Sequence, residues 1–186
     1  MQQARRTALC LLACVALAAC QAQEPLTETD KALFVRVADL SVFGVGYPDA
    51  EARESFSKTK QLDGAYELTY KFETASGAPR PLYMHVSATV GRTTSDAVLA
   101  ETAEKIGLLV AFRKNGVQES EVPGIKVGKL ALLLKDGQPI GNLFTLRDGS
   151  KTYLFIMSGL YVRNPEDWQK LIAPKLERLA RYEAKS

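Results

Sequence analysis

The chain has 186 residues, of which 46% are hydrophobic, and it carries 24 Lys and Arg against 21 Asp and Glu. This length fits a single domain that can bury a substantial core. The nearly balanced charge, with no cluster of basic residues interleaved with aromatic ones, gives no support to nucleic-acid binding.

The first 19 residues have the layout of an export signal. Arg5 and Arg6 precede an almost wholly apolar run, Thr7 to Ala19, that ends in small residues. A helix of about 13 residues is roughly 20 Å long, whereas a membrane-spanning helix must cross about 30 Å of hydrocarbon. The run therefore predicts a cleaved signal peptide, residues 1–19, and not a permanent membrane span.

The end of this run resembles a lipobox, the processing motif of bacterial lipoproteins. Leu17-Ala18-Ala19-Cys20 matches every position of that motif, and the resemblance implies that Cys20 becomes a lipid-modified N-terminus carrying palmitate-type chains. An ordinary signal peptide, cut after its alanines, is the alternative. Gln21, in place of Asp, resembles lipoproteins that are sorted to the outer membrane.

Cleavage before Cys20 changes the composition of the protein. Removing the first 19 of 186 residues leaves 167, and the loss of two arginines leaves 22 basic against 21 acidic side chains. Cys10 and Cys14 leave with the signal peptide, so the mature domain must fold without a disulfide.

Residues 20–29 are polar, include Pro25, and predict a lipidated tether. A single α+β domain is expected over residues 30–186. At its start, Leu33, Val37 and Leu40 fit one face of a helix over Asp30 to Val45, although the same segment also fits a strand.

The next segments predict an antiparallel hairpin. Tyr66, Leu68, Tyr70 and Phe72 alternate with polar residues, which is the period of a half-buried strand. After an interruption at Ala75 to Pro79, the alternation resumes from Leu82 to Val90.

A helix and a meander are expected after the hairpin. Thr93 to Asp96 offers capping side chains, and apolar residues then recur at helical spacing from Val98 to Phe112. Three apolar runs follow, separated by the turn pairs Asp136-Gly137 and Asp148-Gly149, and they predict a three-stranded meander. The runs are Lys129 to Lys135, Ile140 to Arg147 and Thr152 to Leu160.

The last predicted element is an amphipathic helix that begins at Asn164-Pro165, a capping residue followed by proline, and runs to Tyr182. Pro174 predicts a kink or a restart within it. The expected fold class is therefore α+β, an antiparallel sheet (a hairpin plus a three-stranded meander) covered by two amphipathic helices.

From Ala52 to Tyr182 this order of elements resembles the PsbP-like fold, and in particular the DcrB-like bacterial lipoproteins. The resemblance rests on the element order, the aromatic strand Tyr66 to Phe72, and the turn Asp148 to Tyr153 followed by Gly159 and the Trp168 helix. It implies a PsbP-like sheet with helices on its faces and an envelope accessory or binding module. It supplies no catalytic residue.

The search for catalytic and metal-binding residues identifies no catalytic residue, cofactor or metal site. His85 is the only histidine and lies in a predicted strand, opposite in phase to Met84 and Val86. No acid with which it could pair for catalysis is identifiable from sequence. The usual His/Cys metal sites need more ligands of these types than one mature chain supplies.

The aromatic residues of the hairpin have two interpretations. Tyr66, Tyr70 and Phe72, together with Tyr83, are either core residues or an exposed surface for a partner. His85 is expected to face away from the main core, and the candidate partner surface is therefore Tyr66, Tyr70, Tyr83 and His85. Which interpretation holds depends on whether that face of the sheet is covered.

The sequence predicts a non-enzymatic, lipid-anchored protein of the bacterial cell envelope, at the outer membrane and facing the periplasm. Its domain would bind an envelope or secreted protein partner of unknown identity. Two alternatives remain, an immunity or chaperone-like protein for a secreted effector and a hydrolase that uses carboxylates.

Overall fold

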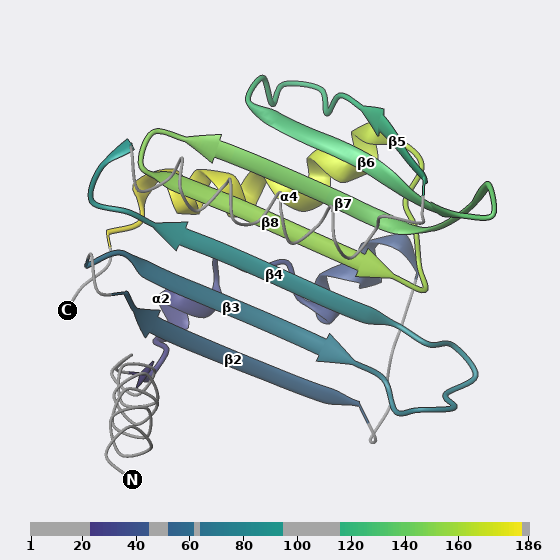
Figure 1. Cartoon of the computed structure of the whole chain (residues 1–186), viewed down its shortest axis with the longest axis horizontal. Helices are drawn as coiled ribbons and strands as arrows, with labels where there is room; N and C mark the ends of the chain where they lie inside the picture. The colour runs from purple at the N-terminus through teal and green to yellow at the C-terminus, as the bar shows by residue number, and fades with distance from the viewer. Residues whose placement is uncertain (1–22, 45–51, 62–63, 95–115, 184–186) are drawn as a thin grey trace, which may run out of the picture.

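A computed structural model describes residues 23–44, 52–61, 64–94 and 116–183 of the chain. Its centre is one antiparallel sheet of eight strands, drawn in Figure 1. In spatial order the strands are β1 (Gln23–Glu24), β2 (Arg53–Lys60), β3 (Tyr66–Glu73), β4 (Tyr83–Val90), β8 (Lys151–Ser158), β7 (Gln138–Asp148), β6 (Gly128–Lys135) and β5 (Gly116–Ser120).

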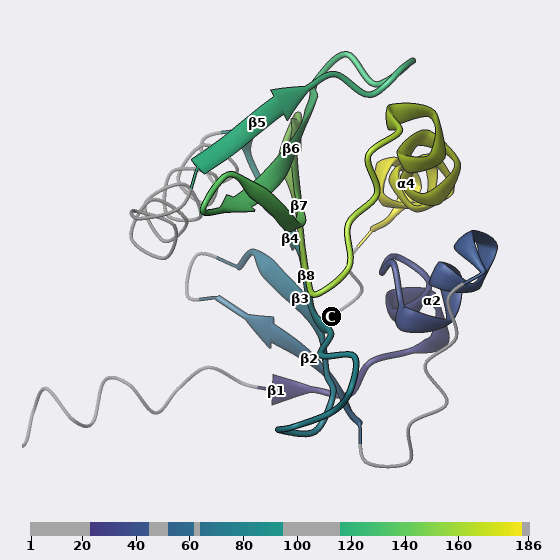
Figure 2. The same ribbon diagram turned by 90° about the vertical axis from the view of Figure 1, so that its right-hand side faces the viewer.

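Three helical segments lie on one face of this sheet, which we call the helix face (Figure 2). They are the four-residue helix α2 (Glu28–Lys31), the 3-10 helix η2 (Val37–Phe43) and the helix α4 (Pro165–Arg181). The hydrophobic core fills the space between these segments and the sheet. Its strand residues include Tyr70, Val86 and Phe155, and its helical ones include Trp168 and Ile172.

The predicted strands are present. The hairpin corresponds to β3 and β4, with Phe72 opposite Met84, and the meander corresponds to β6, β7 and β8. The alternation of apolar and polar residues located these strands because one face of each is buried in the core. The terminal helix also begins as predicted, since the Asn164 side chain accepts a hydrogen bond from the Glu166 N–H.

The expected fold class, a PsbP-like sheet covered by two amphipathic helices, is wrong. The described part of the chain is dominated by its sheet, and α4, with 17 residues, is the one long helix within it. The other expected helix, Val98 to Phe112, lies outside the described residues. Strands β1, β2 and β5 enlarge the sheet beyond the five strands predicted.

The sequence did not predict β1, β2 and β5, and the physical reason differs between them. Strand β1 has two residues, and the five residues of β5 are all exposed, so neither shows an apolar period. Strand β2 carries Arg53, Lys58 and Lys60 in place of apolar residues. Charged residues are typical of strands near the edge of a sheet, where they discourage pairing with other chains.

The segment from Asp30 to Val45 does not form the single helix that its spacing suggested. Helix α2 starts earlier, at a capping box in which Thr27 and Asp30 exchange hydrogen bonds. The chain then runs against the sheet, where the buried Tyr153 hydroxyl donates to the Leu33 carbonyl and accepts from the Val35 N–H. Since these backbone groups bond to a tyrosine, they are not available for a continuous helix.

Helix α4 is fixed to the sheet by buried polar contacts. The Asn142 side chain is fully buried in β7. It donates a hydrogen bond to the Val162 carbonyl at 2.9 Å and accepts one from the Val162 N–H at 2.7 Å. The Trp168 indole donates to the same carbonyl at 3.1 Å. The helix continues through Pro174 without a restart, and Lys175 forms an ion pair with Asp39 of η2 at 3.0 Å.

Candidate functional site

The structure places the four tyrosine and histidine residues singled out above on two different faces of the sheet. Tyr66 and Tyr70 point to the helix face, with exposed fractions of 5% and 0%. The Tyr70 hydroxyl accepts a hydrogen bond from the Val37 N–H at 3.0 Å, and its ring packs 5.1 Å from that of Phe56, centroid to centroid. These two tyrosines belong to the core and hold the N-terminal segment against it.

Tyr83 and His85 point to the opposite face. They are two residues apart in β4, so their side chains are neighbours on one side of the strand. The register of the sheet places His85 between Lys71 of β3 and Ile156 of β8, and Tyr83 between Glu73 and Ser158. We call these six residues the Tyr83–His85 surface.

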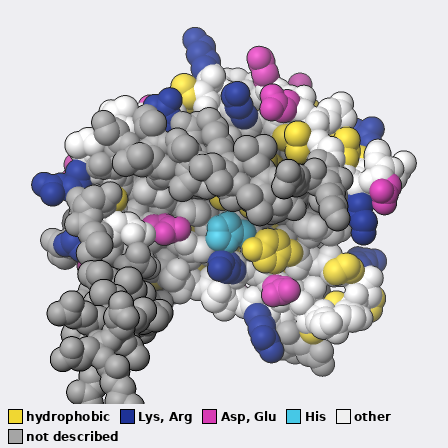
Figure 3. Space-filling view, viewed as in Figure 1, with side chains coloured by type: hydrophobic (Ala, Val, Ile, Leu, Met, Phe, Trp, Pro, Cys, Tyr) yellow, Lys and Arg dark blue, Asp and Glu magenta, His cyan; other side chains and the backbone are white. Residues whose placement is uncertain are grey.

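The Tyr83–His85 surface is accessible at its aromatic centre. Tyr83 is 38% exposed, Lys71 and Glu73 are exposed, and His85 and Ile156 are partly buried. Figure 3 views this face of the molecule and shows the histidine at the surface, with lysine or arginine, acidic and hydrophobic side chains around it.

The electrostatic environment keeps both aromatic side chains of this surface neutral. Burial, and then the positive charge of Lys71, lowers the pKa of His85 below its usual value. Burial, followed by the negative charge of Glu73, raises the pKa of Tyr83. At neutral pH the surface therefore offers an uncharged imidazole and an uncharged phenol, flanked by one cation and one anion.

One ring nitrogen of His85, Nδ1, is buried. Among the residues that the structure describes, this atom has no hydrogen-bond partner. A buried nitrogen without a partner is tolerated more easily as an acceptor than as an N–H donor. We therefore assign the proton of the neutral ring to Nε2.

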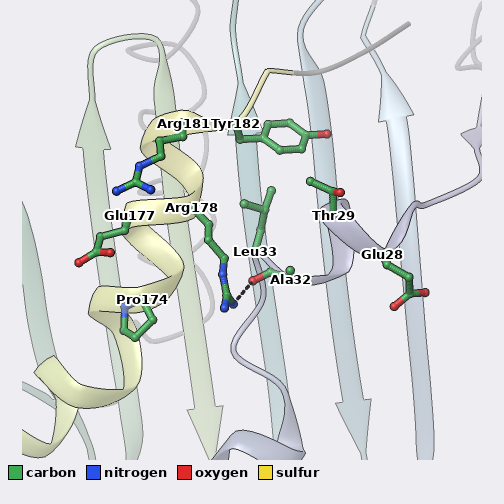
Figure 4. Close-up of a pocket in the computed structure, with 9 residues that line it drawn as sticks. All are labelled: Glu28, Thr29, Ala32, Leu33, Pro174, Glu177, Arg178, Arg181 and Tyr182. Carbon is green, nitrogen blue, oxygen red and sulfur yellow. Dashed lines mark hydrogen bonds between the residues drawn. The ribbon is translucent and has the colours of Figure 1, made fainter.

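Apart from the Tyr83–His85 surface, a concave region lies between α2 and α4 (Figure 4). This groove, with a volume of about 670 Å³, has apolar walls at Leu33 and Pro174 and charged residues of both signs around it. Arg178 is engaged with the fold, since it donates to the Ala32 carbonyl at 3.1 Å. The groove joins segments about 150 residues apart in the chain, and no local pattern could have revealed it.

Beside this groove lies a buried polar cluster that sequence analysis did not identify. Asp30 is 3% exposed and accepts a hydrogen bond from the Tyr182 hydroxyl. Burial alone would raise the pKa of Asp30, but the hydrogen bonds from Tyr182 and Thr27, with the charge of Lys58, outweigh burial and lower it. The Asp30 carboxylate is ionised and bonded on several sides, which indicates a structural role.

The remaining predictions on sites concern lipid, membrane and metal. Cys20, the predicted lipidation site, lies outside the described residues. Within the parts of the chain that are described, no helix has both the length and the apolar character needed to cross a membrane. The same residues contain no group of three or more His, Cys, Asp or Glu side chains able to hold a metal ion.

Comparison of the chain with models of known protein families, with curated proteins and with solved structures finds no match. The Tyr83–His85 surface is therefore interpreted from its own chemistry.

Proposed function

We propose that this chain is a lipid-anchored protein of the bacterial cell envelope that binds a protein partner through the Tyr83–His85 surface. It is held by Cys20 at the outer membrane, faces the periplasm, and has no enzymatic activity. The anchor part of the proposal is supported by the signal sequence and by the lipobox-like residues that end at Cys20.

The observation that carries the binding part is an accessible tyrosine beside a partly buried histidine on one face of β4. Tyrosine supplies a large apolar ring together with a hydroxyl, and it is enriched at protein interfaces for that reason. Tyr83 is 38% exposed. Beside it, the partly buried imidazole of His85, whose pKa is lowered, adds a neutral polar ring to the surface.

The surface favours a polar protein partner over a charged or wholly apolar one. Lys71 and Glu73 give it one charge of each sign, and both aromatic groups are neutral at neutral pH. A partner that presents a carbonyl oxygen to the His85 imidazole and an apolar side chain to Tyr83 would complement it. An immunity or chaperone-like role for a secreted effector is one version of this proposal.

Site-specific photocrosslinking tests the proposal. Benzoylphenylalanine replaces Tyr83 in one variant and Val42 in another; Val42 is 61% exposed and lies on η2, on the helix face. We expect a crosslinked product of one defined mass from position 83 in intact cells, which disappears when His85→Ala is added. Equal products from both positions, or none from position 83, would refute this function for the surface.

A further inference from the structure

The N-terminal segment is built into the fold almost from the predicted lipidation site. Gln23 and Glu24 form β1 and pair with Thr59 and Lys58 at the edge of the sheet. The Glu24 carboxylate lies 3.3 Å from the Lys58 ammonium group. Strand β1 therefore lies within the segment, residues 20–29, that the sequence suggested as a tether.

Farther along, the same segment is held by buried contacts. The capping box of α2 joins Thr27 to Asp30, and Asp30 in turn accepts a hydrogen bond from Tyr182 at the end of α4. Lys58 is 5% exposed and lies 4.0 Å from the Asp30 carboxylate. These contacts prevent the segment after Gln23 from swinging away from the domain as a flexible linker would.

Only Gln21 and Ala22 separate Cys20 from β1. A fully extended chain covers at most about 3.5 Å per residue, so the α carbon of Cys20 lies within roughly 10 Å of that of Gln23. The polar headgroup layer on each side of a bilayer is about 5 to 8 Å thick. A lipid chain on Cys20 would therefore hold β1 at, or just outside, the headgroups.

Because β1 lies at one edge of the sheet, the short distance from Cys20 to β1 also determines how the sheet is oriented relative to the membrane. Strand β1 lies at one end of the strand order and β5 at the other, as Figure 1 shows for β2 and β5. Neighbouring strands are about 4.8 Å apart, so β4 lies about 10 Å, and β5 up to about 29 Å, from β2. If the sheet stands on this edge, the Tyr83–His85 surface clears the headgroups and β5 points away from the membrane.

The chemistry of the β2 edge suits a headgroup layer. Strand β1 pairs with only Lys58 and Thr59, so the rest of β2 borders no other strand on that side among the described residues. Exposed strand edges are sites of unwanted pairing with other chains, and a polar headgroup layer would cover this one. Lys60, whose ammonium group lies 5.4 Å from the centre of the Tyr66 ring, adds a positive charge to this strand, and positive side chains are attracted to anionic lipid headgroups.

We propose that the domain stands edge-on to the membrane, with the edge formed by β1 and β2 at the lipid headgroups and β5 farthest from them. This inference rests on the proposed lipid anchor at Cys20. The occupant of the edge is the bilayer that holds the acyl chains. A sheet lying flat would instead bring Lys60 and β5 equally close to lipid and would cover one of the two faces.

Spin labels on the lipidated, mature protein test this orientation. The protein carries a nitroxide at Lys60→Cys or, as the matched control, at Val117→Cys in β5, where Val117 is 51% exposed. No other free cysteine remains once Cys10 and Cys14 are removed and Cys20 is acylated. Each protein is reconstituted in vesicles of phosphatidylethanolamine and phosphatidylglycerol that contain a lipid with a nickel-chelating headgroup.

We expect nickel lipid to relax the label at position 60 several-fold more than the label at position 117. Inserting about six Gly and Ser residues between Ala22 and Gln23 adds roughly 20 Å of reach and should remove most of this difference. Equal relaxation at the two positions, or a difference that survives the insertion, overturns the orientation.

The intact mass of the same preparations separates this inference from the anchor on which it rests. Acyl chains on Cys20 together with equal relaxation at both positions overturn the edge-on orientation alone. A mass without acyl chains overturns the anchor and the orientation together.

Discussion

The Tyr153 hydroxyl provides the sharpest test of how the N-terminal segment is held to the sheet. Tyr153 is fully buried, and its hydroxyl bonds to two backbone groups, the Leu33 carbonyl at 3.0 Å and the Val35 N–H at 3.2 Å. Tyr153→Phe removes one oxygen atom and, with it, both of these buried hydrogen bonds. Each unsatisfied buried group costs about 1 to 3 kcal/mol, and partial relaxation gives an expected loss of about 2 to 4 kcal/mol in unfolding free energy.

Urea and thermal unfolding of the soluble, non-acylated domain measure this loss. For a chain of this size about 1 kcal/mol corresponds to roughly 2 to 4 °C, so Tm should fall by about 5 to 15 °C. The matched control is Tyr83→Phe, because the Tyr83 ring is partly exposed. If Tyr153→Phe is as stable as this control, the hydroxyl does not hold the N-terminal segment. Our explanation of why Asp30 to Val45 does not form a single helix would then be wrong.

Three further predictions concern pH, a buried charge and a close backbone approach. Burial and Lys71 lower the pKa of His85, so below about pH 6.5 the unfolded chain binds more protons at this residue than the folded chain. The unfolding free energy should therefore decrease as the pH is lowered through this range, and His85→Gln should make that decrease smaller. Asp30→Asn should lower the unfolding free energy by about 2 kcal/mol at neutral pH. Because the pKa of Asp30 is lowered in the folded protein, part of the stability is lost as the pH falls through that pKa, and this part of the loss should be absent from the variant. Urea unfolding at several pH values measures both effects. Gly141→Ala would place a methyl carbon 1.9 Å from the Met157 carbonyl oxygen and should cost about 4 kcal/mol or more, seen as loss of soluble protein or of cooperative unfolding.

The sequence was informative wherever one face of a strand enters the core. Alternation located β3 and β4, and the turn pairs Asp136-Gly137 and Asp148-Gly149 separated the strands of the meander. It was uninformative for β2, because Lys58 takes a buried position that an apolar residue would normally fill. That lysine is compensated by Glu24 and Asp30, which lie more than twenty residues earlier in the chain.

The candidate site shows a related limit. Tyr66, Tyr70 and Tyr83 look alike in sequence, and grouping them as one surface ignored the phase of β4. Because Met84 pairs with Phe72 and faces the core, its neighbour Tyr83 must face the other way. The phase of a strand could therefore separate Tyr83 and His85 from the core tyrosines, but the depth to which each is buried depends on tertiary packing.

The intact mass of the native protein, extracted from the membranes of its host, tests the central claim most directly. Our account predicts a chain that starts at Cys20 and is heavier than its 167 residues by a diacylglyceryl group and an amide-linked acyl chain. The same increment should be absent from a Cys20→Ala variant. A native protein of 186 residues without acyl chains would contradict the account.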